Sequence, residues 1–281
     1  MTIGRKQFVT LAVTGLLLST ISSSLSVADT KKSTEPTNAA EAAAKKAAED
    51  KALDTAYQAW KATLPPEHQA WERVLEQNLG AFYLPIHKRE KVKGTANAWD
   101  YVKDDPKLPR VLLIGDSVSR GYTMATRAAL RGKANVHRAP ENCGPTANGL
   151  KKLDVWLGKG KWDVIHFNFG IHDRATPLAD YEKRLEEIIT RLKKTGAKLI
   201  WASTTPIPDD AAKKQTAASI VERNAVAEKL AKKHGMAVND LFTFITPHLA
   251  VLQPPLDVHF KAEGYELLGQ QVAKSIEGSL K

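Results

Sequence analysis

Cysteine is almost absent from this chain of 281 residues, because Cys143 is the only one. No intramolecular disulfide can therefore form. A domain of this size folds without such cross-links, so their absence is compatible with export. Long apolar runs are also absent after the N-terminal segment, and a membrane-spanning helix needs about 20 apolar residues. The sequence therefore predicts no membrane-spanning helix in the mature protein, and it contains no internal repeats.

The N-terminus has the pattern of an export signal. Arg5 and Lys6 precede an apolar run, residues 8–17, and no acidic residue occurs before Asp29. Residues 26–28 read Ser-Val-Ala, a small-x-small cleavage site. The apolar run is short for a membrane anchor, and no cysteine nearby would carry a lipid. We expect residues 1–28 to be a signal peptide and the protein to be periplasmic or secreted.

Basic residues outnumber acidic ones, with 41 Lys and Arg against 31 Asp and Glu and a net charge of +10. Removal of the signal peptide takes away only Arg5 and Lys6. An excess of positive charge favours acidic surfaces or polyanionic substrates, although a lysine-rich solvated surface is the simpler interpretation. No basic patch is interleaved with aromatic residues, so we expect no nucleic-acid partner. Hydrophobic content of 43% and charged content of 26% are typical of a soluble globular protein.

The composition changes twice before the main domain. Residues 29–55 are rich in Ala, Lys and Glu, with little apolar surface, which indicates a linker or a solvated helix. Residues 56–105 form a predicted helical extension, because Trp71, Leu75 and Leu79 follow one another at i, i+4 spacing. We expect this extension to dock on the main domain, residues 106–281.

From Arg110 onward, short apolar runs alternate with helical patterns. This alternation predicts an α/β domain with a parallel sheet and helices on both faces. Gly196 and Gly235 stand where helix C-caps belong. The apolar runs are RVLLIG, ANVHRA, WDVIHFNFG, AKLIWAS and MAVND. Helices are predicted from about Val118, from about Thr146, and over about Leu178–Lys194, Thr216–His234 and Lys261–Ile276.

Ligands of open parallel sheets bind beyond the carboxyl ends of the strands. Ser117 follows the first strand and begins a helix, so its hydroxyl is a candidate nucleophile near a helix N-terminus. The simpler alternative is that Ser117 only caps this helix. Ser119 stands where a Gly-x-Ser-x-Gly elbow needs its second glycine, which excludes that motif. GDSVSRG also lacks the Gly-Lys-Ser/Thr ending of a phosphate-binding loop.

His259 is the candidate base for this serine. It lies in DVHF just before the last predicted helix, and Asp257 precedes it closely enough to orient the ring. Of the other histidines, we expect His166 in the sheet and His68, His87 and His234 at the surface. A metal site made of His166, His172, Asp173 and His259 lacks the helical HExxH arrangement. We therefore expect neither a metal nor a cofactor.

These motifs together resemble the SGNH hydrolase family, also called GDSL esterases and lipases, over about residues 110–276. The four sequence blocks of the family occur here in the family order: GDS at 115–117, Gly144 in NCGPT, GIHD at 170–173 and DVHF at 257–260. The whole chain, including FYLPIHKREK, resembles an exported bacterial branch of this family. The resemblance implies a three-layer α/β/α fold with a central, mainly parallel five-stranded sheet of flavodoxin-like type. It implies acyl transfer through Ser117 and His259, with the N–H groups of Ser117 and Gly144 in the oxyanion hole.

Two positions depart from the family pattern. His172 stands where the family has the asparagine that gives a third oxyanion donor, and a neutral imidazole can donate one N–H. Asn168 is a possible substitute donor, although a strand-end hydrogen bond explains it equally well. Leu256, not aspartate, precedes His259 by three residues, so Asp257 completes a triad only if the local turn differs. We expect Asp116 and Asp173 to accept backbone N–H bonds and Cys143 to be a packing residue.

Three functions remain in competition. The first is an exported serine esterase acting on short acyl groups such as acetyl on carbohydrate, with Trp156, Trp162 and Trp201 as sugar platforms or core residues. The second is a lipase or thioesterase of the same family. The third is a non-catalytic glycan-binding protein of the cell envelope, which the histidine at position 172 favours. The sequence does not predict the oligomeric state.

Overall fold

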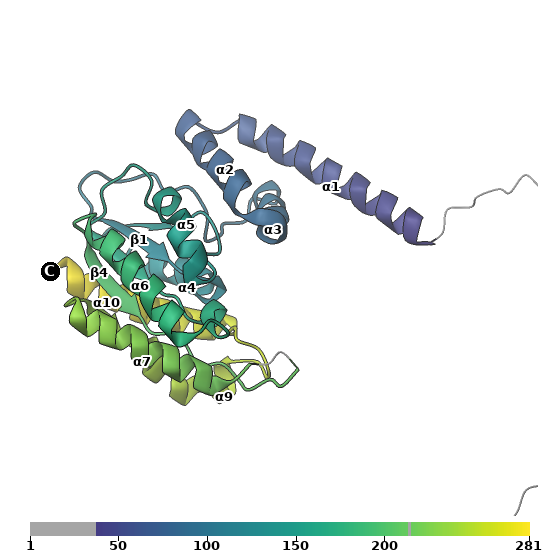
Figure 1. Cartoon of the computed structure of the whole chain (residues 1–281). Coiled ribbons are helices and arrows are strands. Elements are labelled where there is room, and N and C mark those ends of the chain that lie inside the picture. Colours follow the sequence, from purple (N-terminus) through teal and green to yellow (C-terminus); the bar gives the residue numbers. More distant parts are fainter. Residues whose placement is uncertain (1–37, 213–214) are drawn as a thin grey trace, which may run out of the picture. The chain divides into compact units, whose positions relative to one another are not determined.

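A parallel five-stranded sheet is the centre of the computed structural model, which describes residues 38–212 and 215–281 (Figure 1). The chain divides into two units, residues 1–45 and 46–281, and the sheet belongs to the second. The strand order is β2-β1-β3-β4-β5, with every pair parallel. The strands are β1 (Arg110–Ile114), β2 (Asn135–Arg138), β3 (Val164–Phe167), β4 (Lys198–Ala202) and β5 (Ala237–Asn239).

The strand order is that of flavodoxin-like sheets, in which the chain reverses its direction of growth between β1 and β3. Such a switch point opens a crevice beyond the carboxyl ends of the two strands. Ser117 follows β1, and His172 follows β3. The three-layer α/β/α prediction is confirmed, and the topology places both predicted site segments at the switch point.

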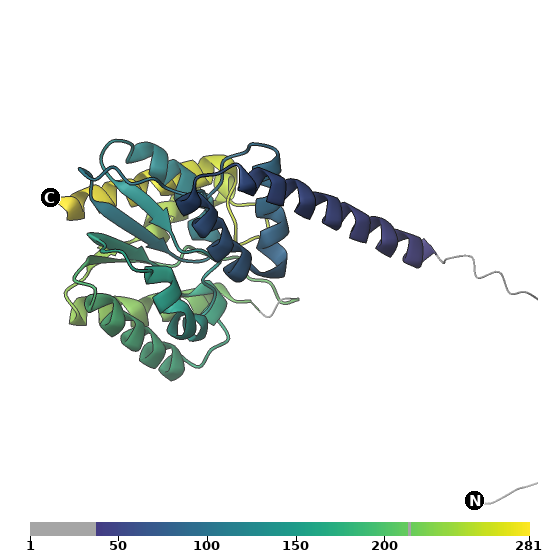
Figure 2. The same ribbon diagram turned by 90° about the horizontal axis from the view of Figure 1, so that it is seen from above.

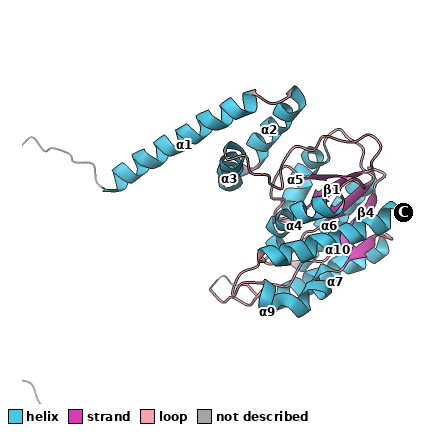
Figure 3. Cartoon of the chain, turned by 180° about the vertical axis from the view of Figure 1, so that it is seen from behind, coloured by secondary structure: helices cyan, strands magenta, loops and turns pink. Residues whose placement is uncertain are grey.

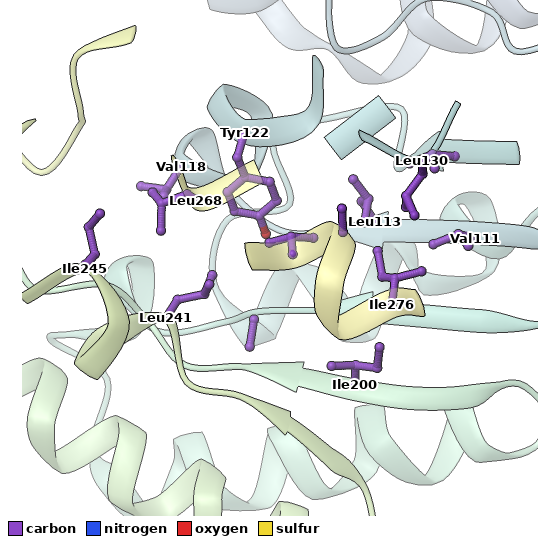
Figure 4. Close-up of a cluster of buried hydrophobic side chains, with 14 of the residues drawn as sticks. Val111, Leu113, Val118, Tyr122, Leu130, Ile200, Leu241, Ile245, Leu268 and Ile276 are labelled. Atoms are coloured by element: carbon purple, nitrogen blue, oxygen red, sulfur yellow. The ribbon is translucent and has the colours of Figure 1, made fainter. Parts of the chain in front are cut away.

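Alternate residues of β1 face opposite layers. Val111 and Leu113 pack in one buried cluster, and Leu112 and Ile114 pack in the other, as the two-residue period of a strand requires. Figure 4 shows the first cluster, where side chains of β1, α4 and α10 meet. Helices α4 (Ser117–Ala129) and α10 (Ala262–Leu280) cover this face, and α5 (Thr146–Leu157), α6 (Leu178–Lys193) and α7 (Ala217–Lys233) cover the other. Figure 2 shows the sheet between yellow α10 and the green helices.

Glycine ends two of the helices, as predicted. Gly196 after α6 has φ +77° and Gly235 after α7 has φ +64°, the left-handed backbone of a C-cap. Between β5 and α10 the chain forms α8 (Leu241–Ile245), a 3-10 turn η2 (Thr246–His248) and α9 (Leu249–Leu252). Figure 3 colours the chain by secondary structure and shows the magenta strands among the cyan helices of the sheet domain.

The N-terminal extension contains the helices α1 (Asn38–Ala62), α2 (Pro66–Asn78) and α3 (Gly80–Val92). Leu75, Leu79 and Trp99 form a small buried cluster of their own. Arg127 of α4 connects the extension to the sheet domain, because its guanidinium donates to the carbonyl oxygens of Asn97 at 3.1 Å and Asp100 at 3.4 Å. From residue 46 onward the extension is therefore docked against α4.

Residues 38–55 are helical and almost wholly exposed, so this stretch of the predicted 29–55 segment matches the solvated helix rather than the linker. The predicted signal peptide, residues 1–28, lies outside the described residues. Within the described part of the chain, no helix is both long enough and apolar enough to cross a membrane.

Candidate active site

Ser117 is the first residue of α4, directly after the turn that leaves β1. The N-cap of this helix is Asp116, whose carboxylate accepts the Val118 N–H at 2.9 Å. Asp116 therefore has the structural role predicted for it, and Ser117 is not the cap. The first turn of a helix leaves N–H groups without intrahelical acceptors, so the N–H of Ser117 is placed to bind an anion.

A buried arginine supports the turn that carries Ser117. The Arg138 guanidinium donates to the carbonyl oxygens of Gly115 at 3.0 Å and Asp116 at 2.9 Å, and to Ser119 Oγ at 2.7 Å. Burial lowers the pKa of Arg138 from its ordinary value. Arg138 was not predicted from the sequence, although an arginine directly after the apolar residues of a buried strand indicates a residue with a structural or functional role.

Ser117, His259 and Asp257 form a continuous chain of hydrogen bonds. His259 Nε2 lies 2.9 Å from Ser117 Oγ, and His259 Nδ1 lies 2.7 Å from Asp257 Oδ1. An imidazole that donates its Nδ1–H to Asp257 has a lone pair at Nε2 for the serine hydrogen. The arrangement is that of a serine, a general base and an orienting carboxylate.

Asp257 is ionised in this arrangement. Burial raises the pKa of its carboxyl, but hydrogen bonds from the backbone N–H and the ring of His259 outweigh burial and hold that pKa below its usual range. About half of each side chain is exposed, 44% for His259 and 46% for Asp257. The pair is therefore open to solvent at the mouth of the sheet.

The turn at Leu256 explains how an aspartate only two residues away reaches His259. Leu256 has φ +56°, a left-handed conformation that no other non-glycine residue of the described chain adopts. Asp257 Oδ1 then accepts both the backbone N–H of His259, at 3.0 Å, and its ring. The local turn therefore differs in the way that Asp257 needs in order to orient the His259 ring from a position two residues before it.

The loop after β2 brings Gly144 to the same edge of the sheet. The Cys143 N–H donates to the Gly115 carbonyl at 3.2 Å, and the Asn148 amide donates to the Cys143 carbonyl at 3.0 Å. Gly144 itself has φ +64°, which glycine adopts without steric cost. Cys143 is fully buried, and burial raises the pKa of its thiol to about 12, consistent with a packing role.

The loop after β3 is held by Asp173. This buried carboxylate accepts the backbone N–H of Thr146 at 2.8 Å and its hydroxyl at 2.7 Å, which joins the loop to the start of α5. His172 precedes it in the 3-10 turn η1 (Ile171–Asp173), and its side chain is exposed. His172 thus follows β3 at the switch point, with its side chain exposed to solvent.

Asn168 does not supply an oxyanion donor. Its amide donates to the Ala202 carbonyl at 2.8 Å and to Thr204 Oγ1 at 3.0 Å. Both amide hydrogens are then engaged at the end of the sheet, so the strand-end interpretation holds and the interpretation as a substitute donor is wrong.

Of the other side chains considered in the sequence, His87 differs from its predicted position, and His166 lies in the sheet as predicted. His87 is fully buried rather than at the surface. His166 lies inside β3, where burial lowers its pKa to about 3 and Asn239 is its neighbour at 3.1 Å. Trp156, Trp162 and Trp201 are buried, so they are core residues and not sugar platforms. Among the described residues, no group of three or more His, Cys, Asp or Glu could hold a metal ion.

Comparison with known proteins agrees with this geometry. Residues 113–267 match the GDSL-like lipase/acylhydrolase family, while no curated protein matches the chain. A lipase/acylhydrolase from Enterococcus faecalis has a similar structure, with 24% identity, 60% of this chain and 96% of that chain covered, and a TM-score of 0.54. An acetylxylan esterase from Geobacillus stearothermophilus has 15% identity, covers 60% of this chain and 94% of its own, and has a TM-score of 0.52.

At these identities the solved structures show a shared fold, and the match over residues 113–267 shows the family. That match begins inside β1 and ends inside α10, so it includes the sheet and the segments that carry Ser117, Gly144 and His259. The chain belongs to the GDSL-like lipase/acylhydrolase family, with the SGNH hydrolase fold, and is a carboxylic ester hydrolase.

Proposed function

We propose that the protein is an exported serine esterase that hydrolyses carboxylic esters through an acyl-enzyme on Ser117. The observation that carries the proposal is the hydrogen-bonded chain from Ser117 Oγ through His259 to Asp257. A serine hydroxyl is a weak nucleophile until an adjacent base removes its proton. The 2.9 Å contact with His259 Nε2 provides such a base.

In the first half of the reaction, Ser117 Oγ attacks the ester carbonyl carbon while its hydrogen moves to His259 Nε2. The N–H groups of Ser117 and Gly144 face the oxyanion of the tetrahedral intermediate. His259 then gives the proton to the alcohol oxygen as the carbon–oxygen bond breaks. In the second half, water attacks the carbonyl carbon of the acyl-enzyme while its proton moves to His259. His259 then gives this proton to Ser117 Oγ as the bond to the acyl carbon breaks and the carboxylic acid leaves.

The proposed substrates are short acyl esters of carbohydrate, with acetyl as the first choice. Two proteins whose solved structures have a similar fold are acetylxylan esterases, namely AlAXEase and an enzyme from Geobacillus stearothermophilus. Their similarity supports this substrate class. The similar fold of the lipase/acylhydrolase from Enterococcus faecalis supports a lipase as the alternative. The dependence of the rate on acyl length separates these two substrate classes.

The test compares wild type, Ser117→Ala and His259→Ala, each produced without residues 1–28. Ser279→Ala and His248→Ala are matched controls, because Ser279 lies near the C-terminal end of α10 and His248 is an exposed residue of η2. We expect the site variants to lose hydrolysis of an aryl acetate and of acetylated xylooligosaccharides, and the controls to keep it. Hydrolysis that persists in Ser117→Ala would overturn the proposal. Faster turnover of long-chain than of acetyl esters would favour the lipase.

The proposed export has a separate test. Expression of the full chain, followed by N-terminal sequencing of the mature protein, should give a new N-terminus at Asp29. A protein that keeps Arg5 and Lys6 at its N-terminus would contradict cleaved export.

A further inference from the structure

A cavity of about 530 Å³ lies between the extension and the sheet domain, and its volume is typical of small-molecule sites. Its lining includes residues 100–104 of the extension and residues 155–160 around the end of α5. Ligand sites are common at such boundaries between parts of a fold. Neither Ser117 nor His259 lines the cavity, so it is separate from the candidate active site.

The two carboxylates in this lining are already engaged by basic groups of the protein. Asp104 accepts the Arg110 guanidinium at 2.8 Å and lies 2.6 Å from His137 Nε2. Asp100 binds the Lys91 ammonium. Little negative charge therefore remains in the cavity to attract a cationic ligand.

Four cationic side chains of the same lining form no ion pair within the described residues. Arg127 and Arg138 donate to backbone carbonyl oxygens, which carry no net charge. Lys103 and Lys159 are exposed, and in the described part of the chain their side chains have neither a hydrogen bond nor an ion pair. The cavity therefore has an excess of positive charge, which favours an anionic ligand.

Two half-buried aromatic rings give the cavity apolar surface as well. Trp71 donates its indole N–H to the Trp99 carbonyl at 2.7 Å, so its ring is left for van der Waals contact. Tyr101 stacks on His68, with ring centroids 4.9 Å apart, and its hydroxyl has no hydrogen bond to the described residues. Aromatic faces pack against the C–H groups of a pyranose ring, and a free phenol can bind sugar hydroxyls.

We propose that this cavity is a second ligand site, which binds a hexuronate unit of an acidic polysaccharide. The uronate carboxylate is attracted by Lys103 and Lys159, and the sugar ring packs against Trp71 and Tyr101. Binding here goes beyond the esterase activity, because it does not require Ser117. Its link to catalysis rests on the proposed function, since a polysaccharide held by one sugar presents its esters to the same enzyme molecule.

The test is isothermal titration calorimetry of the intact protein with trigalacturonate. Maltotriose, which has sugar rings without charge, and inorganic phosphate, which has charge without a sugar ring, are the comparison ligands. We expect trigalacturonate to bind about 10-fold more tightly than either of them, because only it has both features. We also expect its affinity to fall as NaCl is added, because salt screens exposed charges.

Val155→Glu and Val155→Gln are a matched pair of variants within the cavity. Val155 lines the cavity and is 41% exposed in α5, so both polar side chains can be accommodated outside the core. Only the glutamate adds negative charge. We expect Val155→Glu to bind trigalacturonate about 10-fold more weakly than Val155→Gln, because like charges repel.

The double variant Lys103→Ala/Lys159→Ala should also bind about 10-fold more weakly than wild type. Lys194→Ala/Lys232→Ala is its control, since these two exposed lysines do not line the cavity and their removal changes the net charge equally. This control should keep wild-type affinity.

Three results would overturn the site. They are equal affinity of Val155→Glu and Val155→Gln, binding of maltotriose as tight as that of trigalacturonate, and binding of phosphate as tight as that of trigalacturonate. Hydrolysis of an aryl acetate is measured separately on the same proteins. Loss of the uronate site therefore leaves the esterase proposal intact, and an inactive esterase that binds trigalacturonate would overturn only the link to catalysis.

Discussion

Two kinds of side chain surround Ser117. Asp116 and Arg138 bind backbone groups of the turn and fix where the serine stands, whereas His259 interacts with its hydroxyl. Only the second kind can take part in the movement of charge during the reaction. Substitutions of the two kinds should therefore separate changes in rate from changes in stability.

Asp257→Asn should lower kcat with little effect on folding. The asparagine cannot accept the imidazole N–H as a carboxylate does, so His259 loses its orientation and the stabilisation of its charged form. We expect a fall of about 10²- to 10⁴-fold, the contribution of general acid–base catalysis. Steady-state hydrolysis of an aryl acetate measures it. Asp154→Asn, at a side chain that is 88% exposed, is the control, and an Asp257→Asn enzyme with wild-type kcat would contradict the triad.

Arg138→Met should act mainly through stability. Removal of the guanidinium takes away its hydrogen bonds to the carbonyl oxygens of Gly115 and Asp116, which keep only their backbone donors. We expect the free energy of unfolding to fall by about 2–4 kcal/mol, since a hydrogen bond to a charged group contributes about 1.5–3 kcal/mol. Urea denaturation followed by circular dichroism measures this loss. Unchanged stability would show that the turn does not depend on Arg138.

At the scale of elements, α4 and α10 cross closely because α10 has a glycine at the contact. A Cβ atom at Gly269 would lie 2.4 Å from Ala125 Cβ and 2.9 Å from the Thr126 backbone nitrogen. Backbone atoms cannot give way as a flexible side chain can. This contact therefore fixes the position of α4, which begins at Ser117, relative to α10, which follows His259 in the chain.

Gly269→Ala should destabilise the protein by about 1–3 kcal/mol, the usual effect of overpacking. Gly278→Ala is the control in the same helix, because a Cβ there meets nothing within 4 Å. That control should be neutral or gain up to about 1 kcal/mol from the higher helix propensity of alanine. Thermal unfolding of both variants measures the difference in melting temperature. Equal melting temperatures would contradict the close crossing of α4 and α10.

The sequence predicted most elements of the sheet domain to within a few residues. The short apolar run RVLLIG identified β1, and Gly196 and Gly235 marked helix ends, because these signals are local in the chain. The contacts that could not be predicted are long-range or depend on a backbone angle. Arg138 of β2 reaches the turn of Ser117 only through the pairing of β2 with β1, and Asp257 reaches His259 only through the turn at Leu256. His87 looked exposed because its partners, Glu72 and Asn97, are distant in sequence.

At the scale of the whole molecule, the extension contains a buried polar network centred on Glu72. Its carboxylate accepts the Tyr57 hydroxyl and His87 Nε2, each at 2.7 Å. Burial raises the pKa of Glu72, but the hydrogen bonds and charge of its partners outweigh burial and leave that pKa below the ordinary value of 4.5. Because its pKa is lowered in the folded state, Glu72 binds a proton more readily in the unfolded chain than in the folded one.

A lowered carboxyl pKa stabilises the folded state above the unfolded-state pKa, and this stabilisation disappears as the pH falls through the folded-state pKa. We expect Glu72→Gln to be less stable than wild type by about 1–3 kcal/mol at neutral pH. The difference should shrink below the ordinary pKa of 4.5. Urea unfolding of both proteins across this range tests the sign, and a difference that grows on acidification would contradict it.

The most direct test of the account is to identify the acyl-enzyme. Wild-type protein would be mixed with an aryl acetate, quenched in acid before turnover is complete, digested and mapped by mass spectrometry. The account predicts a single acetyl group on the peptide that contains Ser117, and none in Ser117→Ala. Hydrolysis by the wild type that proceeds without acetylation of Ser117, and continues in Ser117→Ala, would contradict the account.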